Sequence, residues 1–565
     1  MREEKAVMTS TDLSTRVRNR EAVIEIWRTV LDLDGSEISD EDHFFRLGGH
    51  SLLMIRMIHL LNEAMGVEIE VQDVSSQPTV GAIVELLERT SRSERTPASV
   101  EGTPTDPPFF PLLPAQVLRA AKIRSRPSTG QAGPHENYAA AFRLHGHFDS
   151  EVLRKAVWRV LERHDALRVR VSPDGLSGSV AAIGTVDPVS EVNLRHRDIL
   201  DLLLAIRGEV LRAFDLDSGL LLRTTLFRLS SDESILTIVA SSFAWDGWAS
   251  REIFVRDLSA EYAAMVSDDH RADLAAPSSF ARYCIERAHR HDPAREAELW
   301  SYWLEVLRGI GPVPEFRVPG SAPVPPISDS RASARIFRKV APDVVQDLRR
   351  AERSTTLFTI GIAAIFLLLH QYYGDGKVGV LAPSGNRTAR GSEQIVGPFA
   401  HFIVLVAEIP PGATVGTVLR LAQESTAEAQ RHAGISHEEL VARLLPDVSA
   451  GADGWPVRTA TFAVEFESRS TPLLGNLQAI PEPIAGQQLE NISLWLVRKG
   501  STDSEVSIEV AAQYDLSWLQ PNEIEDLMAD FETALEYLVR APDVKASEVS
   551  LRLVRGDGGA AGRVD

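Results

Sequence analysis

Residues 92–108 constrain the fold more than any other stretch of this chain, because a single compact domain cannot accommodate them. They are rich in proline, serine and threonine and contain almost no large apolar side chain. Such a segment buries too little apolar surface to fold and behaves as an extended linker. The linker predicts a small unit at residues 14–91 and a much larger unit after residue 108.

The overall composition is typical of a soluble multidomain protein. The chain has 59 basic and 79 acidic side chains, a net charge of −20, which argues against a nucleic-acid-binding protein. No signal peptide is recognisable at the N-terminus, and the most apolar stretch, residues 357–369, is too short to span a bilayer and predicts a buried helix. We therefore expect a cytoplasmic protein with no membrane partner.

Cysteine and histidine usage narrows the chemistry. The single cysteine, Cys284, excludes a disulfide framework within the chain and a zinc site built from clustered thiolates. The histidines of the large unit lack metal-ligand spacing with a second ligand group, so no metal site is expected.

The small unit has the apolar periodicity of short helices. Apolar side chains recur at the spacing of one helix face between residues 23 and 31, and a strongly apolar helix is predicted from Leu52 to Met65. Gly66 stands where a helix-ending glycine belongs, and Pro78 where a first-turn proline opens a last helix through Leu87. The pattern predicts a bundle of about four short helices.

Ser51 is the candidate modification site of this bundle. It follows Gly48, Gly49 and His50 and directly precedes the apolar helix, so it stands at a helix N-terminus, where unpaired amides and the helix dipole favour a negative group. An ordinary N-cap serine is the alternative interpretation.

Around this serine, the pattern Asp42-x-Phe44-Phe45-x-Leu47 followed by residues 48–52 resembles the peptidyl carrier proteins of nonribosomal peptide synthetases, and the resemblance extends over residues 17–90. It implies that a phosphopantetheinyl transferase attaches 4'-phosphopantetheine to Ser51. The terminal thiol of that group would carry an aminoacyl or peptidyl thioester on a flexible arm, at high effective concentration near a neighbouring site.

The large unit alternates between helical and β-rich patterns, which predicts an α/β arrangement. Helices are expected at residues 151–164, 203–214, 298–307 and 522–539, and strands at residues 235–240, 377–380 and 402–406.

Several stretches of the large unit resemble, in the same order, the condensation domains of those synthetases. They are residues 113–116, 163–168, 214–216, 221–223, 302–309, 356–373, 379–387, 396–399, 432–441 and 514–516. The resemblance implies two chloramphenicol-acetyltransferase-like lobes in a V with a tunnel between them. We expect the lobes at residues 109–285 and 286–548, followed by a disordered tail at 549–565.

The hallmark of that family, HHxxxDG at the end of a buried strand, is altered here. Ser241 and Ser242 replace both histidines, while Asp246 and Gly247 are present. A serine hydroxyl cannot accept a proton near neutral pH without a base of its own. General acid–base help is worth about 10²–10⁴-fold, whereas holding two reactants together reaches effective molarities of about 10⁵–10⁸ M. Placement of the amine beside the thioester can therefore outweigh the missing base.

Four residues besides Ser241 and Ser242 belong to this candidate site. The resemblance implies a buried ion pair between Asp246 and Arg223, which favours a structural role for Asp246, with a catalytic role as the alternative. Gly247 belongs to the same catalytic motif and is expected to allow a tight backbone turn. His401 follows the stretch 396–400 and is either a replacement base facing the tunnel or a structural histidine.

Together these features predict a carrier–condensation didomain of a nonribosomal peptide assembly line for an antibiotic or a siderophore. The carrier would be loaded by an adenylation domain in trans, and the acyltransferase-type condensation domain would form an amide bond with an acceptor on a downstream carrier protein. One alternative is a catalytically inactive domain that recruits a trans-acting tailoring enzyme to the loaded carrier. Another is altered acyl chemistry, such as ester formation, cyclisation or dehydration.

Overall fold

The computed structural model describes two compact units. The smaller unit holds residues up to 105 with the short segments 352–356 and 385–393, and the larger unit holds the rest. The described residues are 10–31, 38–44, 47, 51–67, 69, 73–74, 78–90, 108–125, 130, 132–133, 136–146, 149–184, 187–267, 272, 274, 279–314, 316, 318–319, 333–352, 355–387, 389, 391–446, 460–466, 473–474, 477–482, 492–500, 506–516 and 519–555.

The N-terminal part of the small unit is helical, as the periodicity predicts. Its long helices are α1 (Ser10–Leu31), α2 (Ser51–Met65) and α4 (Val80–Thr90). Trp27 of α1 is fully buried and packs edge-to-face against Phe44, with 5.3 Å between the ring centroids. Gly66 adopts φ +63° directly after α2, which is the conformation that ends a helix at a glycine. The remaining helix of the expected bundle would fall between residues 67 and 78, which lie mostly outside the described part of the chain.

The first sheet of the large unit has six strands in the order β12 (Leu473–Leu474), β13 (Leu477–Glu482), β2 (Asn137–His145), β7 (Glu233–Ser241), β6 (Leu222–Arg228) and β5 (Val189–Asn193). All its neighbouring strands pair antiparallel except β5 and β6, which are parallel. The expected strand at residues 235–240 is β7, which is buried on both faces, and this explains its continuous apolar run.

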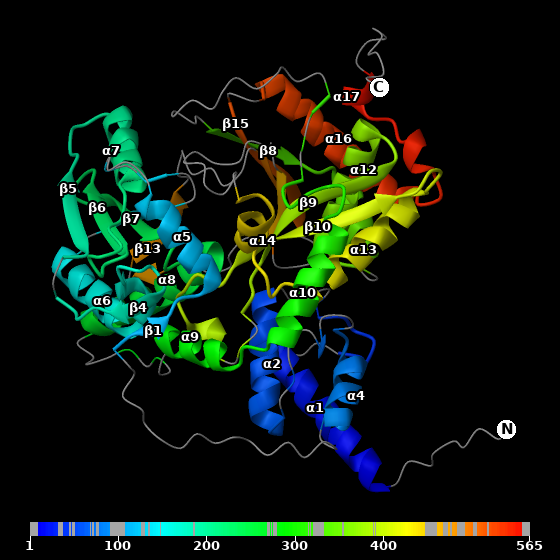
Figure 1. Ribbon diagram of the computed structural model, residues 1–565. Helices are drawn as coiled ribbons and strands as arrows, with labels where there is room; N and C mark the ends of the chain where they lie inside the picture. Colours follow the sequence, from blue (N-terminus) through cyan, green and yellow to red (C-terminus); the bar gives the residue numbers. More distant parts are fainter. Residues whose placement is uncertain are drawn as a thin grey trace. The chain divides into compact units, whose positions relative to one another are not determined.

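Helices cover both faces of this sheet (Figure 1). On one face α6 (Ser150–Arg163) and α8 (Gly247–Val266) pack on side chains such as Leu236 and Ile238. On the other face α7 (Ile199–Leu211) packs on the alternate side chains, among them Ile235 and Val239.

The second sheet has the order β10 (His401–Ile409), β9 (Gly376–Ser384), β11 (Ala460–Phe466), β14 (Ile492–Lys499), β15 (Ser507–Asp515) and β8 (Ser333–Lys339). Its core contains α12 (Leu357–Tyr373), α13 (Val415–Arg431) and α16 (Pro521–Arg540). Residues 357–369 thus form a core helix, as their length and apolarity predict. The expected helices at 151–164, 203–214, 298–307 and 522–539 correspond to α6, α7, α10 (Pro293–Val306) and α16.

Shorter elements complete the large unit. They are β1 (Phe110–Pro111), α5 (Pro114–Arg124), η1 (Asp165–Arg168), β3 (Val169–Val171), β4 (Ser177–Val180), α9 (Phe280–His289), α11 (Pro342–Ala351), α14 (His437–Leu444), η3 (Ala546–Glu548) and α17 (Arg552–Arg555). The 3-10 helix η2 (Ser392–Gln394) begins in the segment 385–393 of the smaller unit.

Two sequence-based boundaries differ from the structure. The division at residues 285/286 does not separate the two sheets, because β12 and β13 come from the later half of the chain and extend the first sheet through the pairing of β13 with β2. The expected disordered tail begins too early, since Val549 and Leu551 are buried and Asp530 accepts hydrogen bonds from the first backbone amides of α17. Residues 556–565 lie outside the described part of the chain.

Candidate functional site

Ser51 is the first residue of α2, the position expected from the sequence. The first turn of this helix carries no acidic side chain, so its N-terminal amides are not already neutralised by a carboxylate of the same turn. Gly48, Gly49 and His50 lie outside the described residues. The position suits a phosphodiester, whose charge the helix N-terminus stabilises.

The altered motif forms a buried turn at the end of β7. Ser241 is the last residue of that strand, and its amide donates to the carbonyl of Leu221 at 3.0 Å. The amide of Ser242 donates to the carbonyl of Glu136 at 2.8 Å. Ser241 and Ser242 are only 1% and 2% exposed. Hydrogen bonds to Leu221, before β6, and to Glu136, before β2, therefore fix the backbone of the turn.

The hydroxyl of Ser242 has no hydrogen-bond partner among the described residues. This hydroxyl stands where the family motif has its second histidine, and a base within hydrogen-bond distance would be needed to activate it. Since the described part of the chain offers no such base, the residue cannot take over the acid–base role of an imidazole in this arrangement.

Asp246 caps helix α8. Its Oδ1 accepts from the backbone amide of Ser250 at 3.0 Å and from the Ser250 hydroxyl at 2.6 Å. Its Oδ2 accepts from the amide of Ala400 at 3.2 Å, which ties the cap to the segment before β10. A buried carboxylate with these donors holds two segments together, because it links the first turn of α8 to the backbone amide of Ala400.

Arg223 does not form the expected ion pair with Asp246. Its Nε lies 3.5 Å from Oε2 of Glu209, and its guanidinium donates to the carbonyls of Glu209, Arg212 and Ala213 at the end of α7. The guanidinium also stacks over the ring of Phe214 at 3.8 Å. Arg223 therefore neutralises the C-terminal end of α7, where a cation interacts favourably with free carbonyls.

Gly247 also differs from the expectation. It is the first residue of α8 and has a helical backbone rather than a tight turn. A Cβ at this position would meet only Cε1 of Tyr138 among the described atoms, at an ordinary contact distance of 3.7 Å. Neither its backbone conformation nor its described surroundings require glycine.

Arg119 is a residue of this site that the sequence patterns did not single out. It donates to the carbonyl of Ser242 at 2.5 Å and to Oε1 of Glu438 at 2.6 Å. One helical turn earlier on α5, Gln116 donates to the carbonyl of Phe243 at 2.9 Å. Gln116 ends one of the family-like stretches, and the i, i+3 spacing from it to Arg119 is the available signal that both side chains share one helix face.

The contact between Arg119 and Glu438 joins α5 to α14, and Arg119 determines the ionisation of the Glu438 carboxyl. Burial alone would raise the pKa of Glu438, but the charge and hydrogen bond of Arg119 outweigh it and hold the pKa at about 2. Glu438 is therefore ionised at neutral pH, and the bridge beside the motif turn is a full ion pair.

His401 begins β10, next to Ala400, whose amide contacts Asp246. Its side chain is buried, and its Nε2 has no hydrogen-bond partner in the described ranges. Burial lowers its pKa to about 4, with Glu438 opposing the shift, so the ring is neutral at physiological pH. A neutral imidazole can accept a hydrogen bond, but one with so low a pKa is a weak proton acceptor.

The structure thus brings Ser241, Ser242, Asp246 and Gly247 together on one turn and places His401 beside it. Arg223 is held at the end of α7 instead. The tunnel implied by the resemblance stays a prediction.

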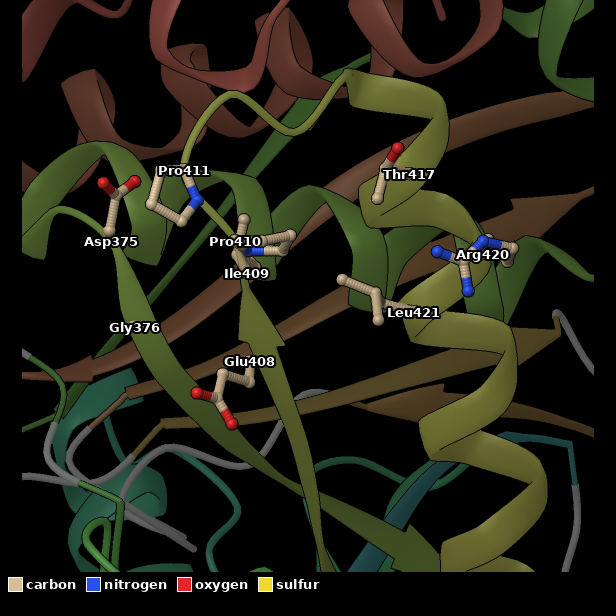
Figure 2. Close-up of a pocket in the computed structure, with 9 residues that line it drawn as sticks. All are labelled: Asp375, Gly376, Glu408, Ile409, Pro410, Pro411, Thr417, Arg420 and Leu421. Atoms are coloured by element: carbon tan, nitrogen blue, oxygen red, sulfur yellow. The ribbon is translucent and has the colours of Figure 1, made fainter.

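A cavity of about 530 Å³ lies elsewhere, where the ends of β9 and β10 meet α13, and it is lined by Asp375, Gly376, Glu408, Ile409, Pro410, Pro411, Thr417, Arg420 and Leu421 (Figure 2). None of the motif residues contributes to it.

The described residues contain no group of three or more histidine, cysteine or acidic side chains placed to hold a metal ion. No helix in the described ranges has the length and apolarity needed to cross a bilayer. Burial raises the pKa of the Cys284 thiol, so this cysteine is an unreactive core residue.

Comparison with protein families and known proteins identifies both units. Residues 109–553 match the condensation domain family, and residues 21–87 match the phosphopantetheine attachment site family. Tyrocidine synthase 3 of Brevibacillus parabrevis is 24% identical over 562 residues, which are 97% of this chain but only 8% of that protein. The chain therefore spans a small part of the curated relatives that it matches.

Solved structures share the fold of the large unit. A complex of the X-domain and OxyB from teicoplanin biosynthesis matches with a TM-score of 0.67 and 23% identity, covering 79% of this chain and 97% of that one. The first condensation domain of the calcium-dependent antibiotic synthetase matches with a TM-score of 0.60 and 18% identity, covering 79% and 100%. The chain belongs to the condensation domain family and, with its phosphopantetheine attachment domain, has the carrier–condensation arrangement of nonribosomal peptide synthetases.

Proposed function

We propose that this chain is a recruiting module of a nonribosomal peptide synthetase. In this proposal Ser51 carries an aminoacyl or peptidyl thioester on phosphopantetheine, and the condensation-fold domain binds a trans-acting enzyme that modifies the tethered acyl group. The observation that carries it is the hydroxyl of Ser242, which replaces the motif imidazole, is buried, and contacts no base among the described residues.

The chemistry of the motif turn supports a loss of catalysis. An absent general base costs about 10²–10⁴-fold in rate. The carbonyl of Ser242 is engaged by Arg119, and the carboxylate of Asp246 is engaged by Ser250 and Ala400. The polar groups of the turn are therefore used to hold the protein together, which suits a binding role.

A known structure supports the recruiting role by analogy. The X-domain from teicoplanin biosynthesis, which shares the fold at a TM-score of 0.67, was solved in a complex with a second protein, OxyB. Fold likeness alone does not transfer function, so the weight of the proposal rests on Ser242.

The proposal implies a defined set of partners. A phosphopantetheinyl transferase would modify Ser51, and an adenylation domain acting in trans would load the resulting thiol. Transfer of the modified acyl group to a downstream carrier protein would be catalysed by a condensation domain other than this one.

Amide formation by the condensation domain is the second candidate, and His401 favours it. Its buried Nε2 has no partner within the described protein, so the fold leaves this acceptor unused, and this candidate requires that a substrate amine reach it. Since placement alone can supply effective molarities of about 10⁵–10⁸ M, a weak base beside a well-placed amine would suffice. The partner carrier would then be the acceptor in the reaction.

One experiment separates the two candidates. The full chain is loaded at Ser51 by a phosphopantetheinyl transferase with an aminoacyl-coenzyme A, which bypasses the adenylation domain, and is then offered an aminoacylated acceptor carrier. Intact-protein mass spectrometry follows loading and transfer, with Ser51→Ala as the control that cannot be loaded. The proposal expects loading without amide formation above the background aminolysis rate.

Two variants sharpen the result. Amide formation by the wild type that His401→Ala abolishes would contradict the recruiting role and favour the second candidate. A strong gain of amide formation in Ser242→His would show that the chain still positions both substrates and lacks only the base.

A further inference from the structure

Helix α7 presents an unusual row of exposed aliphatic side chains. Ile199, Leu200, Leu203 and Leu204 are 64%, 59%, 48% and 57% exposed. We name these four residues the α7 stripe. Their spacing places them on adjoining positions over the first two turns of the helix, so they form one continuous apolar surface.

The fold does not need the α7 stripe. The helix already has an apolar face that packs on the first sheet, formed by Leu202, Ile206 and Val210. An amphipathic helix normally carries polar side chains on the opposite face. The α7 stripe instead extends from the edge of the buried face, at Ile199 and Leu203, to the outer side of the helix, at Leu200 and Leu204, and forms a contiguous apolar patch. Such patches mark interaction sites on soluble proteins.

The acidic and basic side chains around the α7 stripe differ in whether they have a partner. The acidic side chains have partners: Asp198 caps the helix through the amide of Asp201, and Asp201 pairs with Arg197 at 3.7 Å. At the far end of the helix Glu209 pairs with Arg212 at 2.7 Å and with Arg223 at 3.5 Å.

Two arginine side chains near the α7 stripe have no such partner within the described ranges. Arg195 precedes the α7 stripe and Arg207 follows it by one helical turn, and both are exposed. Within the described ranges, neither guanidinium makes a hydrogen bond or an ion pair. The α7 stripe is therefore an apolar surface with an available positive charge near each end, on a chain whose net charge is −20.

We infer that the α7 stripe is a docking surface for a partner protein that presents an apolar helix face flanked by carboxylates. The leucine side chains would be buried against that face, and Arg195 and Arg207 would pair with the flanking carboxylates. Identifying this partner as the trans-acting enzyme rests on the proposed function, whereas the affinity of the stripe for such a helix does not.

Two other occupants fit less well. A second copy of the chain would bring the stripe against itself and would offer no carboxylates placed to pair with Arg195 and Arg207, since Asp198 caps the helix and Asp201 pairs with Arg197. It would also place like-charged arginines of both copies at one interface. An anionic bilayer would attract Arg195 and Arg207 but repel a chain of net charge −20.

The test uses the full chain and two synthetic helical peptides. Both carry leucines at i, i+3, i+4 and i+7, one flanked by glutamates and the other, matched in length, by lysines. Fluorescence anisotropy measures their binding to the wild type. We expect the glutamate peptide to bind at least about tenfold more tightly than the lysine peptide, with affinity falling as salt increases.

Variants assign the binding to the α7 stripe. Leu203→Glu with Leu204→Glu, and separately Arg207→Glu, are each expected to weaken binding of the glutamate peptide at least about tenfold. Leu304→Glu on α10 is the matched control, since Leu304 is also exposed, at 46%, and lies outside the stripe. Circular dichroism confirms that each variant remains folded.

Several other outcomes would overturn the inference, and each assigns the α7 stripe differently. Equal binding of both peptides, or unchanged binding by the double variant, excludes an acidic helix as the occupant. A dimer in analytical ultracentrifugation that Leu203→Glu with Leu204→Glu dissolves assigns the stripe to a second copy, and stripe-dependent sedimentation with phosphatidylglycerol vesicles assigns it to a membrane. Amide formation by the loaded wild type would defeat the proposed function while leaving the peptide result standing.

Discussion

Arg119 and Glu438 form an ion pair, with 2.6 Å between Nη2 and Oε1, that joins helix α5 to helix α14 across 319 residues of sequence. The same guanidinium holds the carbonyl of Ser242 in the altered motif. Their side chains are 19% and 30% exposed, so the pair is partly shielded from water and from salt. One contact therefore couples the motif turn to the packing of the second sheet.

This pair predicts an acid-sensitive contribution to stability that Glu438→Gln removes. The pKa of Glu438 is lowered in the folded chain from 4.5 to about 2, so the ionised form stabilises the fold above the unfolded pKa. That contribution, at most about 3 kcal/mol, is lost as the pH falls from 4.5 towards 2. Urea unfolding at neutral pH and across this range should show the wild type converging on the variant.

The matched control for this prediction is Glu286→Gln. Glu286 pairs with Arg282 at 3.0 Å on the surface, where both side chains are about half exposed. Such pairs contribute about 0–1 kcal/mol. A gap between wild type and Glu438→Gln that stays constant with pH would contradict the assigned ionisation.

A double-mutant cycle tests the partner of Arg223. Because Arg223 contacts Glu209 and the end of α7 rather than Asp246, Arg223→Ala and Glu209→Ala should be coupled, by about 0.5 kcal/mol or more. Arg223→Ala and Asp246→Asn should instead be additive to within about 0.3–0.5 kcal/mol. Chemical denaturation of the single and double variants measures both cycles. Strong coupling in the second cycle would instead support the ion pair between Arg223 and Asp246 that the sequence predicts.

Asp257 is expected to be among the most costly side chains to remove. Its carboxylate has no exposed surface and accepts from Arg163 at 2.7 Å, from His164 at 2.9 Å and from Arg256 at 2.7 Å, which ties α8 to the end of α6. Although burial opposes ionisation, the hydrogen bonds from His164 and Arg256 lower its pKa to about 2. Asp257→Ala would remove the one buried carboxylate that Arg163, His164 and Arg256 share, and should cost about 3–5 kcal/mol in thermal or urea unfolding.

Glu424→Ala is the control for Asp257→Ala. Glu424 forms an i, i+4 pair with Arg420 at 2.7 Å, and both side chains are more than half exposed. Its removal should change stability by about 0.3–0.5 kcal/mol. Similar losses in the two variants would refute the role assigned to burial.

Gly361 of α12 should tolerate no larger side chain. A Cβ there would overlap with the ring of Phe462, in the fully buried contact between α12 and β11. Gly361→Ala should therefore destabilise the chain by about 1–3 kcal/mol through overpacking. Adding Phe462→Leu should recover part of the loss, which differential scanning calorimetry would detect.

Gly208→Ala makes the opposite prediction within α7. A Cβ at Gly208 meets no described atom within 4 Å, so alanine gains helix propensity without a clash. The variant should gain about 0.5–1 kcal/mol. An equal loss of stability in both glycine variants would contradict the prediction that close packing against Phe462 requires a glycine at position 361.

Local patterns in the sequence were sufficient for most elements and for the position of the motif. The apolar run at 357–369 became α12, the run at 235–240 became β7, and the altered motif lies at the end of that strand. Ser51 begins α2, as the glycine-rich approach predicted. These predictions succeed because burial along one helix or strand leaves a periodic trace in neighbouring residues.

The partners of polar side chains and the later strands of the first sheet depended on tertiary structure. Arg119 meets Glu438, Arg223 turns to α7 rather than to Asp246, and β13 crosses to pair with β2. An ion pair or a strand pairing between remote residues depends on the path of the whole chain and leaves no periodic trace nearby. Only packing of both sheets against their helices brings these groups within hydrogen-bond distance.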